Sequence, residues 1–264
     1  MLPTIKIKSD DVTAKARREA AAQRVIAHFD NQLPNTRLLC FFDDEDCEAV
    51  KEEVGEANRG LFMRVERVCL WGYLPEYVRV CAFSGDCSDF PSYAEPPVTP
   101  VFDHLIYLHG STCSNDVGLT MTFAHELQHF VQHGNVRQLW AANSLIGKLR
   151  QQLNNDLGLR QFHIPTEREA RIVSKQTTSA IFGGEHVKQF IESKIPHAVD
   201  DKDKADWQSI QSLVTSTPYD LASETRLIFQ RLKGYRGDFE KLLQELKDDP
   251  DFNDIDLDDL FNGV

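Results

Sequence analysis

The sequence predicts an α+β protein, in which an N-terminal mixed α/β sheet region is followed by a region made of helices. Two observations predict this class. The β-rich runs all lie within the first 110 residues, where they alternate with helix-forming segments. From about residue 118 onward, apolar residues recur at helical spacing and glycines stand where helices would end. Strands with helices, followed by helices alone, are typical of α+β architecture.

The first region begins with the short alternating segment Ile5–Lys8. Ser9 or Asp10 can then cap a helix that runs to about Phe29. The elements expected next are a buried strand at 37–42, a helix at 43–54, adjacent strands at 61–70 and 77–83, an irregular loop at 84–100 that ends in a proline-rich stretch, and a strand at 105–108.

Helices are expected in the second region at 119–133, 136–156, 167–182, 185–194, 205–215 and 221–247. The chain therefore divides into an α/β region at 1–115, a helical region at 116–247 and a tail at 248–264. The tail interleaves acidic with apolar residues, and it is expected to be solvated or to fold onto a partner or onto its own domain.

The net charge restricts the classes of partner. The formal charge is −12, from 29 basic and 41 acidic residues, and such a balance argues against direct binding to nucleic acid or to an anionic membrane surface. Seven of the acidic residues lie in the tail, so residues 1–247 carry only −5. The chain before the tail is therefore only mildly acidic.

No secretion signal or membrane-spanning run is apparent, so the sequence predicts a cytoplasmic protein. The six cysteines are irregularly spaced, without a Cys-x-x-Cys pair, and we expect them to be reduced core residues.

The segment that predicts chemistry is His125-Glu126-Leu127-Gln128-His129, an H-E-x-x-H sequence. On a helix, residues four apart share a face, so both imidazoles can reach one zinc ion. Glu126 is rotated by about 100° from His125, where it can contact a metal-bound water and accept its proton. Only about 0.02 such matches are expected by chance in a chain of this length. The motif indicates one Zn²⁺ held by His125 and His129, with Glu126 as the catalytic base.

The segment Thr122–Val131 resembles the active-site helix of zincin metallopeptidases. This resemblance covers the motif and the strand before it. It implies that His125 and His129 are zinc ligands, that Glu126 is the general base, and that the strand 105–108 is the edge strand against which an extended substrate pairs.

A third ligand is needed, and several downstream residues are candidates. Position 135 is Asn, which excludes the extended metzincin motif, and His133 lies about 12 Å along the helix from His125. The segment Glu167–Ala170 is similar to the helix that donates a glutamate ligand in gluzincins, and within that group to cytoplasmic peptidases that cleave phage and stress repressors. Glu167 is the favoured ligand. The alternatives are Glu169, which can also form a capping box with Thr166, and His163 or His186.

Two further features leave alternatives open. Cys113 lies upstream of the motif, as the thiolate ligand does in peptide deformylases, but the other motifs of that family are missing and a buried thiol is the simpler interpretation. A donor to the developing oxyanion is also expected; the candidates are His186, Arg171, Tyr219 and Tyr235.

The function predicted from the sequence is that of a zinc-dependent endopeptidase acting on protein or peptide substrates. One alternative is a metal-dependent amidase or deformylase acting on a small amide. The other is a non-enzymatic interaction protein that acts through its acidic tail, for which a regulatory partner is possible. An open groove beside a strand would favour a peptide, and a closed pocket a small molecule.

Overall fold

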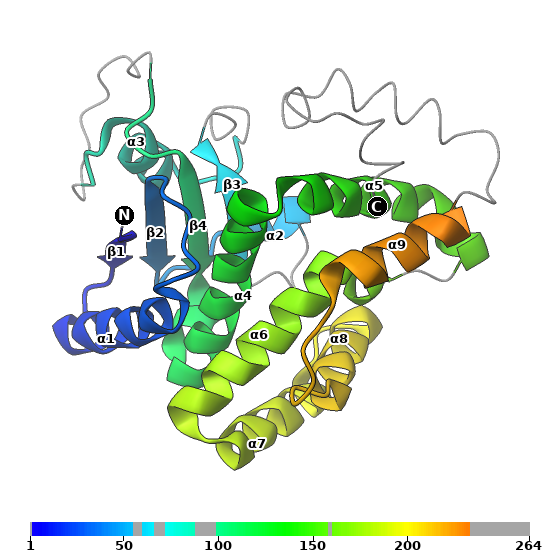
Figure 1. Ribbon diagram of the computed structural model, residues 1–264. Helices are drawn as coiled ribbons and strands as arrows, with labels where there is room; N and C mark the ends of the chain where they lie inside the picture. The colour runs from blue at the N-terminus through cyan, green and yellow to red at the C-terminus, as the bar shows by residue number, and fades with distance from the viewer. Residues whose placement is uncertain (1, 55–59, 66–71, 88–98, 158–159, 233–264) are drawn as a thin grey trace.

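The computed structural model describes the chain except residues 1, 55–59, 66–71, 88–98, 158–159 and 233–264 (Figure 1). The described part contains a four-stranded mixed sheet of order β1-β2-β4-β3. The strands are β1 (Thr4–Lys8), β2 (Leu38–Asp43), β3 (Gly60–Arg64) and β4 (His104–His109). Strands β1, β2 and β4 are parallel, and β3 pairs antiparallel with β4. The expected succession of a mixed sheet and then helices is confirmed.

Helices cover both faces of the sheet. Alternate residues of β2 point to opposite faces, because successive side chains of a strand do so. Phe42 packs with α1 (Val12–Phe29) and α4 (Asp116–Asn135), whereas Phe41 packs with α2 (Glu48–Val54) and α3 (Glu76–Ser84). All six residues of β2 and of β4 are buried, as expected for central strands covered on both sides.

The remaining helices lie on the far side of α4 from the sheet (Figure 1). They are α5 (Arg137–Leu157), α6 (Pro165–Phe182), α7 (Gly184–Lys194), α8 (Asp201–Ser212) and α9 (Leu221–Leu232). Small residues let α6 approach α4 closely: Ala170 and Ser174 are buried, and the Ser174 hydroxyl donates to the carbonyl of Met121 at 2.6 Å. This contact joins the middle of α6 to the N-terminal half of α4.

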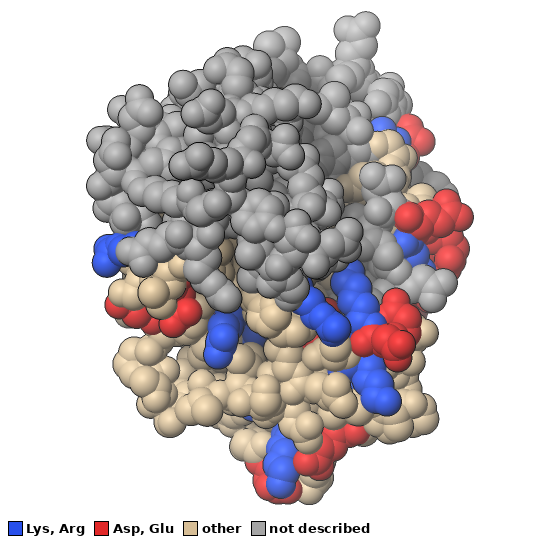
Figure 2. Space-filling model, turned by 90° about the vertical axis from the view of Figure 1, so that its right-hand side faces the viewer, with Lys and Arg blue, Asp and Glu red and all other residues tan. Residues whose placement is uncertain are grey.

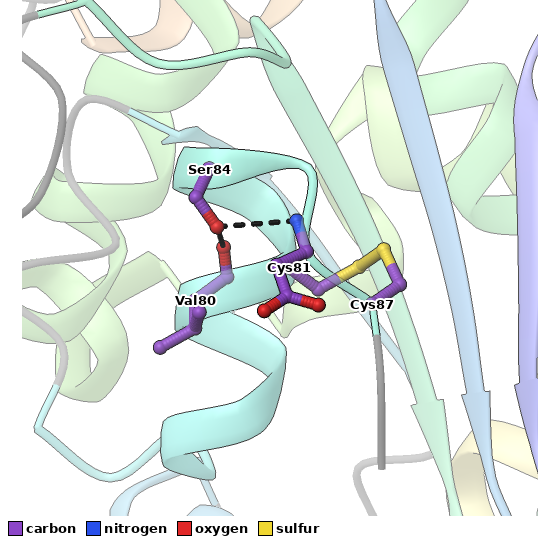
Figure 3. Close-up of a disulfide and its surroundings, with 5 residues drawn as sticks. Val80, Cys81, Ser84 and Cys87 are labelled. Carbon is purple, nitrogen blue, oxygen red and sulfur yellow. Dashed lines mark hydrogen bonds between the residues drawn. A yellow bond between two sulfur atoms is a disulfide. The ribbon is translucent and has the colours of Figure 1, made fainter. Parts of the chain in front are cut away.

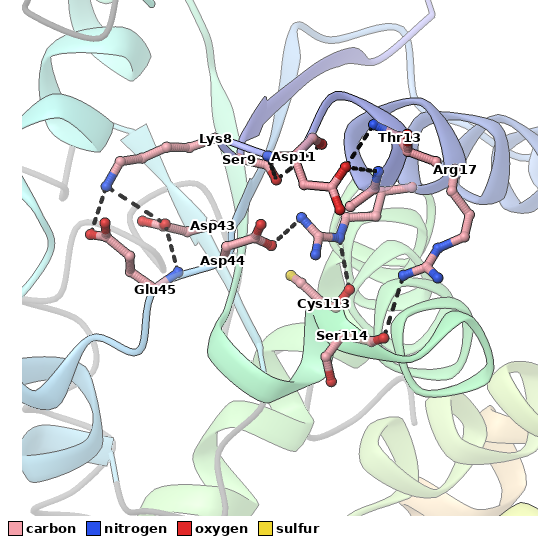
Figure 4. A network of polar contacts seen from close by, with 12 residues as sticks. Lys8, Ser9, Asp11, Thr13, Arg17, Asp43, Asp44, Glu45, Cys113 and Ser114 are labelled. Atoms are coloured by element: carbon pink, nitrogen blue, oxygen red, sulfur yellow. Dashed lines mark hydrogen bonds and ion pairs between the residues drawn. The ribbon is translucent and has the colours of Figure 1, made fainter.

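A polar network at the carboxyl ends of β1 and β2 anchors the segment that precedes α4 (Figure 4). Arg18 of α1 forms an ion pair with Asp44 and donates from Nε to the carbonyl of Cys113 at 2.7 Å. Arg17 reaches the first turn of α4, where its Nε lies 2.9 Å from the Asp116 carboxylate. The network therefore ties the start of α4 and the segment before it to α1, and α1 to the residue after β2.

The strand expected at 77–83 is wrong, because these residues form the helix α3. Val78, Cys81 and Ala82 are buried at helical spacing. The helix ends at Gly85, which adopts a left-handed conformation with φ of 74° and donates from its N–H to the carbonyl of Cys81. The β-branched composition suggested a strand, but the i, i+3, i+4 spacing of the buried residues is helical.

The expectation that all cysteines are reduced is also wrong. Cys81 and Cys87 form a disulfide that joins α3 to the residues after it (Figure 3). The turn between them is held by Ser84, whose hydroxyl donates to the carbonyl of Val80 at 2.8 Å and accepts from the N–H of Asp86 at 3.1 Å. Cys40, Cys47 and Cys113 are free, and Cys69 lies outside the described residues.

One other expectation is wrong, and two others fall partly outside the described residues. The strand 105–108 is not an edge strand, because β4 lies between β2 and β3; the edge strands of the described sheet are β1 and β3. The helix expected at 221–247 is described as α9 up to Leu232, and the strand expected at 61–70 as β3 up to Arg64. The tail at 248–264 lies outside the described residues. Among the helices that are described, none has the length and apolarity needed to cross a membrane.

Candidate metal centre

Helix α4 carries the H-E-x-x-H segment in its middle. Its N-terminus is capped by Asn115, whose side chain accepts from the N–H groups of residues 117 and 118 at 2.9 and 3.0 Å. Leu127 and Phe130 point from the helix into the core against the sheet. The opposite face, which carries His125 and His129, is thereby turned toward α6.

Helix α6 places Glu167 opposite the two histidines. The Nε2 atoms of His125 and His129 lie 3.0 Å apart, and they lie 3.5 and 3.3 Å from the carboxylate oxygens of Glu167. Ligand atoms bound at about 2.0–2.1 Å in a tetrahedron are about 3.3 Å apart. The three side chains therefore fit one zinc ion, and they form a group of potential metal ligands in the described chain.

The alternative third ligands lie elsewhere. His186 is exposed on α7 and stacks on Phe182. His163 accepts from the backbone N–H of Arg160 at its Nδ1. Cys113 is fully buried, and burial raises the pKa of its thiol to about 12. None of the three belongs to the potential metal-binding group found among the described residues.

Glu169 supports the site from behind rather than capping α6. Its Oε2 accepts from the side-chain amides of Gln132 at 2.8 Å and Gln128 at 3.1 Å. The capping box expected between Thr166 and Glu169 is wrong, because α6 begins with Ile164 as its N-cap and has no side-chain cap. Gln132 also donates to the carbonyl of Thr166 at 3.0 Å, and its Oε1 lies 2.8 Å from Nδ1 of His129.

Sequence reasoning missed Gln132, although one signal was available. Gln132 follows His129 by three residues, a spacing at which side chains on a helix are neighbours. Metal-bound histidines commonly donate their second ring N–H to an oxygen acceptor, and Gln132 supplies such an acceptor.

The side chain of Glu126, on α4, lies beside the edge strand β3. Its side chain is only 7% exposed, and burial together with the charge of Glu167 raises its pKa to about 7, although His129 opposes this shift. A Cβ atom at Gly60 would lie 3.1 Å from Cγ of Glu126 and 2.4 Å from a methyl group of Leu108. Glycine at position 60 thus lets the strand backbone pass beside the carboxylate.

The charges of the three potential ligands depend on one another. Burial lowers the pKa of His125 to about 4. Burial also disfavours a charged His129, but the Glu167 carboxylate outweighs this effect and raises the pKa of His129 to about 9. The pKa of Glu167 is held well below its usual value, because His129 and His125 outweigh the effect of burial. The site therefore stabilises an anionic Glu167 facing positive charge.

A cavity of about 390 Å³ opens in front of these residues. One wall is formed by residues 60–62 of β3 and another by residues of α7 and α8, among them Phe190, Lys194, Lys202 and Trp207. Figure 2 shows the side of the molecule that lies at the right in Figure 1, where basic and acidic side chains are interspersed. Neither sign of charge dominates the described surface on that side.

Of the candidates for an oxyanion donor, Arg171 lies at the cavity. It follows Glu167 by one helical turn and lines the same space. Tyr219 lines a separate cavity behind α4, near Gln132 and Glu169. Tyr235 lies outside the described residues. The structure thus brings His125, Glu126, His129, Glu167 and Arg171 together at one cavity.

No family model matches the sequence, and the searches of curated proteins and of solved structures likewise find no similar protein.

Proposed function

We propose that the chain is a zinc-dependent endopeptidase, in which His125, His129 and Glu167 hold one Zn²⁺ and Glu126 is the general base. The observation that carries this proposal is the spacing of 3.0 to 3.5 Å among three ligand atoms from two helices. These atoms face a cavity that Glu126 also lines. Structural zinc sites are commonly rich in cysteine and closed, whereas this arrangement is neither.

Bound at these residues, zinc would polarise a substrate carbonyl and lower the pKa of a water molecule. Glu126 accepts the proton of the attacking water and delivers it to the amine that leaves. Its buried position suits this role, because burial raises the pKa of the carboxylate and so favours holding the proton between the two steps. Gln132 and Glu169 orient the ring of His129.

The edge strand favours a peptide over a small amide as the substrate. Within the described sheet, β3 pairs with β4 on one side, and residues 60–62 line the cavity on the other. An extended peptide can add to such an edge through backbone hydrogen bonds. A small-molecule amidase has no use for this edge, so the amidase or deformylase remains the second candidate.

An interaction protein that acts through its acidic tail is the non-enzymatic alternative. This alternative gives no role to the buried Glu126, or to the contacts that Gln132 and Glu169 make behind His129. A regulatory partner for the tail is compatible with the peptidase. We also propose a cytoplasmic location, although the Cys81–Cys87 disulfide weighs against it, because disulfides are rare in reducing compartments.

Metal analysis and cleavage assays on three forms of the full chain test the proposal. Wild type should contain one zinc ion per chain and should cleave a subset of proteins in a proteome digest, detected by mass spectrometry of new termini. Glu126→Gln should retain zinc but lose cleavage, because it removes only the base. His125→Ala should lose both.

A neighbouring substitution provides the control. Gln138→Met changes an exposed residue near the start of α5, outside the cavity, and should leave both readouts unchanged. Wild-type protein without stoichiometric metal after loading with zinc would refute the catalytic assignment. Cleavage that persists in Glu126→Gln would refute the role of the base.

A further inference from the structure

The cavity continues past the potential metal ligands toward α7 and α8. Its wall there combines the aromatic rings of Phe190 and Trp207, whose centroids lie 6.0 Å apart, with basic side chains. The basic residues that line the cavity are Arg171, Lys194 and Lys202. This end of the cavity therefore offers apolar contact area beside positive charge.

Arg171 is the most buried of these cations, with 8% of its surface exposed. Its Nη2 lies 3.5 Å from the carboxylate of Asp206, and its Cζ lies 5.9 Å from the centre of the Phe162 ring. Its Nη1 is buried and has no hydrogen-bond partner in the described structure. Asp206 and Phe162 orient the guanidinium, while one of its donor groups remains unused.

Such an arrangement is costly unless an acceptor arrives. A buried donor without a partner costs free energy, and the cost is larger for a charged group. The Arg171–Asp206 separation of 3.5 Å is also longer than a normal N–H···O hydrogen bond, so this ion pair leaves donor capacity at Nη2. The ligand that best matches the planar fork of a guanidinium is a carboxylate.

The acidic residues on the same wall do not remove this preference. Asp200 is engaged as the N-cap of α8, where it accepts from the N–H of Asp203 at 2.7 Å. Asp206 is the residue that orients Arg171, and burial raises its pKa. Lys194 and Lys202 add two basic side chains to this end of the cavity, and the nearby Glu167 carboxylate faces His125 and His129.

We propose that Arg171 binds a carboxylate of the peptide substrate, on a residue whose apolar part packs against Phe190 and Trp207. The carboxylate belongs either to an acidic side chain near the scissile bond or to the C-terminus of a short peptide; the chemistry of recognition is the same. Arg171 acts here as a specificity-determining residue. This inference rests on the proposed peptidase function, because it assumes that the ligand is a peptide.

Peptide binding to the Glu126→Gln protein, which should not cleave the peptides, tests the inference. Two matched sets of peptides serve as probes: acetyl-Gly-Leu-Phe as the free acid and as the carboxamide, and acetyl-Gly-Leu-Glu-Phe-amide beside acetyl-Gly-Leu-Gln-Phe-amide. The dissociation constants are measured by calorimetry, with and without zinc. In at least one pair, we expect the acidic peptide to bind at least about tenfold more tightly than its neutral partner, both with and without the metal.

Variants assign the difference to Arg171. In Arg171→Gln the preference for the acidic peptide should fall to about twofold or less, and Arg171→Lys should restore part of it. Arg168→Gln, at an exposed position one turn earlier, should keep the full preference. Thermal unfolding of each variant shows whether it folds. The comparison of peptides in the protein with Arg171 intact does not depend on these variants.

Three outcomes separate this inference from the proposed function. Equal binding of both members of each pair overturns the carboxylate site and leaves the peptidase proposal standing. If the preference for the acidic peptide survives in Arg171→Gln, other residues recognise the carboxylate, and the proposed role of Arg171 is overturned. A preference that depends on Arg171, in a protein whose wild type cleaves no peptide, supports the carboxylate site and refutes the peptidase.

Discussion

The Nδ1 atom of His129 lies 2.8 Å from Oε1 of Gln132, and this contact determines which ring nitrogen faces Glu167. The amide group of Gln132 is oriented by its own partners. Its nitrogen donates to the carbonyl of Thr166 and to Glu169, both of which only accept, so its oxygen must face His129. The oxygen accepts a hydrogen bond from Nδ1–H of His129, and Nε2 remains available for a metal.

Loss of this acceptor should weaken zinc binding. We expect Gln132→Met to lower zinc affinity by about 10- to 100-fold, because the His129 ring loses its orienting hydrogen bond. Competition with a chromophoric chelator measures the affinity. Gln138→Met is the matched control, since this glutamine is exposed on α5, and it should bind zinc as wild type does. Unchanged affinity in Gln132→Met would show that the hydrogen bond does not support the site.

The two glutamates of α6 should respond differently to the same substitution. Glu167→Gln removes a carboxylate from the potential metal ligands, and we expect zinc affinity to fall by more than about 100-fold. Glu169→Gln keeps an oxygen that can accept from Gln128 and Gln132, so its affinity should stay within about tenfold of wild type. Zinc titrations of the two variants make the comparison. The reverse order would identify Glu169 as the ligand.

The sequence was sufficient to predict the helix that carries the motif, but not every contact around it. His125, Glu126 and His129 follow from local spacing, because residues four apart on a helix share a face. Glu167 was favoured by its position at a helix start, and the structure places it beside both histidines. The role of Glu169 depends on how α6 packs on α4, and a capping pattern in the sequence carries no information about that packing.

The errors in the predicted fold have a similar origin. Residues 77–83 are rich in β-branched and aromatic types, yet they form α3 because their buried positions recur at helical spacing. The order of strands in the sheet is a non-local property. The strand 105–108 was expected at the edge, but β3 pairs beyond it and takes that position. Local propensity cannot reveal which strand is last in a sheet.

Stability should fall in mild acid because of His104. Burial lowers the pKa of its imidazole to about 4. The charges of Arg64 and Arg137 lower this pKa further, and the charge of Asp103 raises it. The ring of His133 packs 4.9 Å away. An unfolded histidine has a pKa of about 6.5, so between pH 6.5 and 4 the unfolded chain binds a proton that the folded chain does not. The free energy of unfolding therefore decreases as the pH falls through this range.

Replacement of His104 by Phe tests this linkage. Between pH 7 and pH 5 the wild type should lose about 2 kcal/mol more of its unfolding free energy than His104→Phe loses. Urea unfolding followed by circular dichroism provides the values. The aromatic ring keeps the contact with Phe62, on which the imidazole stacks at 5.6 Å. His28→Gln, at an exposed position, controls for the loss of one imidazole. Parallel pH profiles of wild type and His104→Phe would contradict the assignment.

Lys175 should hold the α8 wall of the cavity in place. Its Nζ donates to the carbonyls of Ile210, Gln211 and Leu213, at 3.0, 2.9 and 2.9 Å, and so satisfies the C-terminal end of α8. We expect Lys175→Met to accelerate amide hydrogen exchange in residues 201–212 by about tenfold or more, because hydrogen bonds from a charged donor are lost. Lys188→Met, at an exposed position on α7, should leave this exchange unchanged.

The same variant distinguishes the α8 wall from the metal ligands. Residues 202, 206 and 207 line the cavity from α8, whereas the potential zinc ligands lie on α4 and α6. Lys175→Met should therefore weaken peptide binding while zinc affinity stays within about twofold of wild type, because no ligand is moved. Calorimetry with the peptides and chelator competition for zinc measure the two affinities on one preparation. If the zinc affinity of Lys175→Met falls together with its peptide affinity, α8 also supports the metal ligands. The α8 wall and the ligands would then form one cooperative unit.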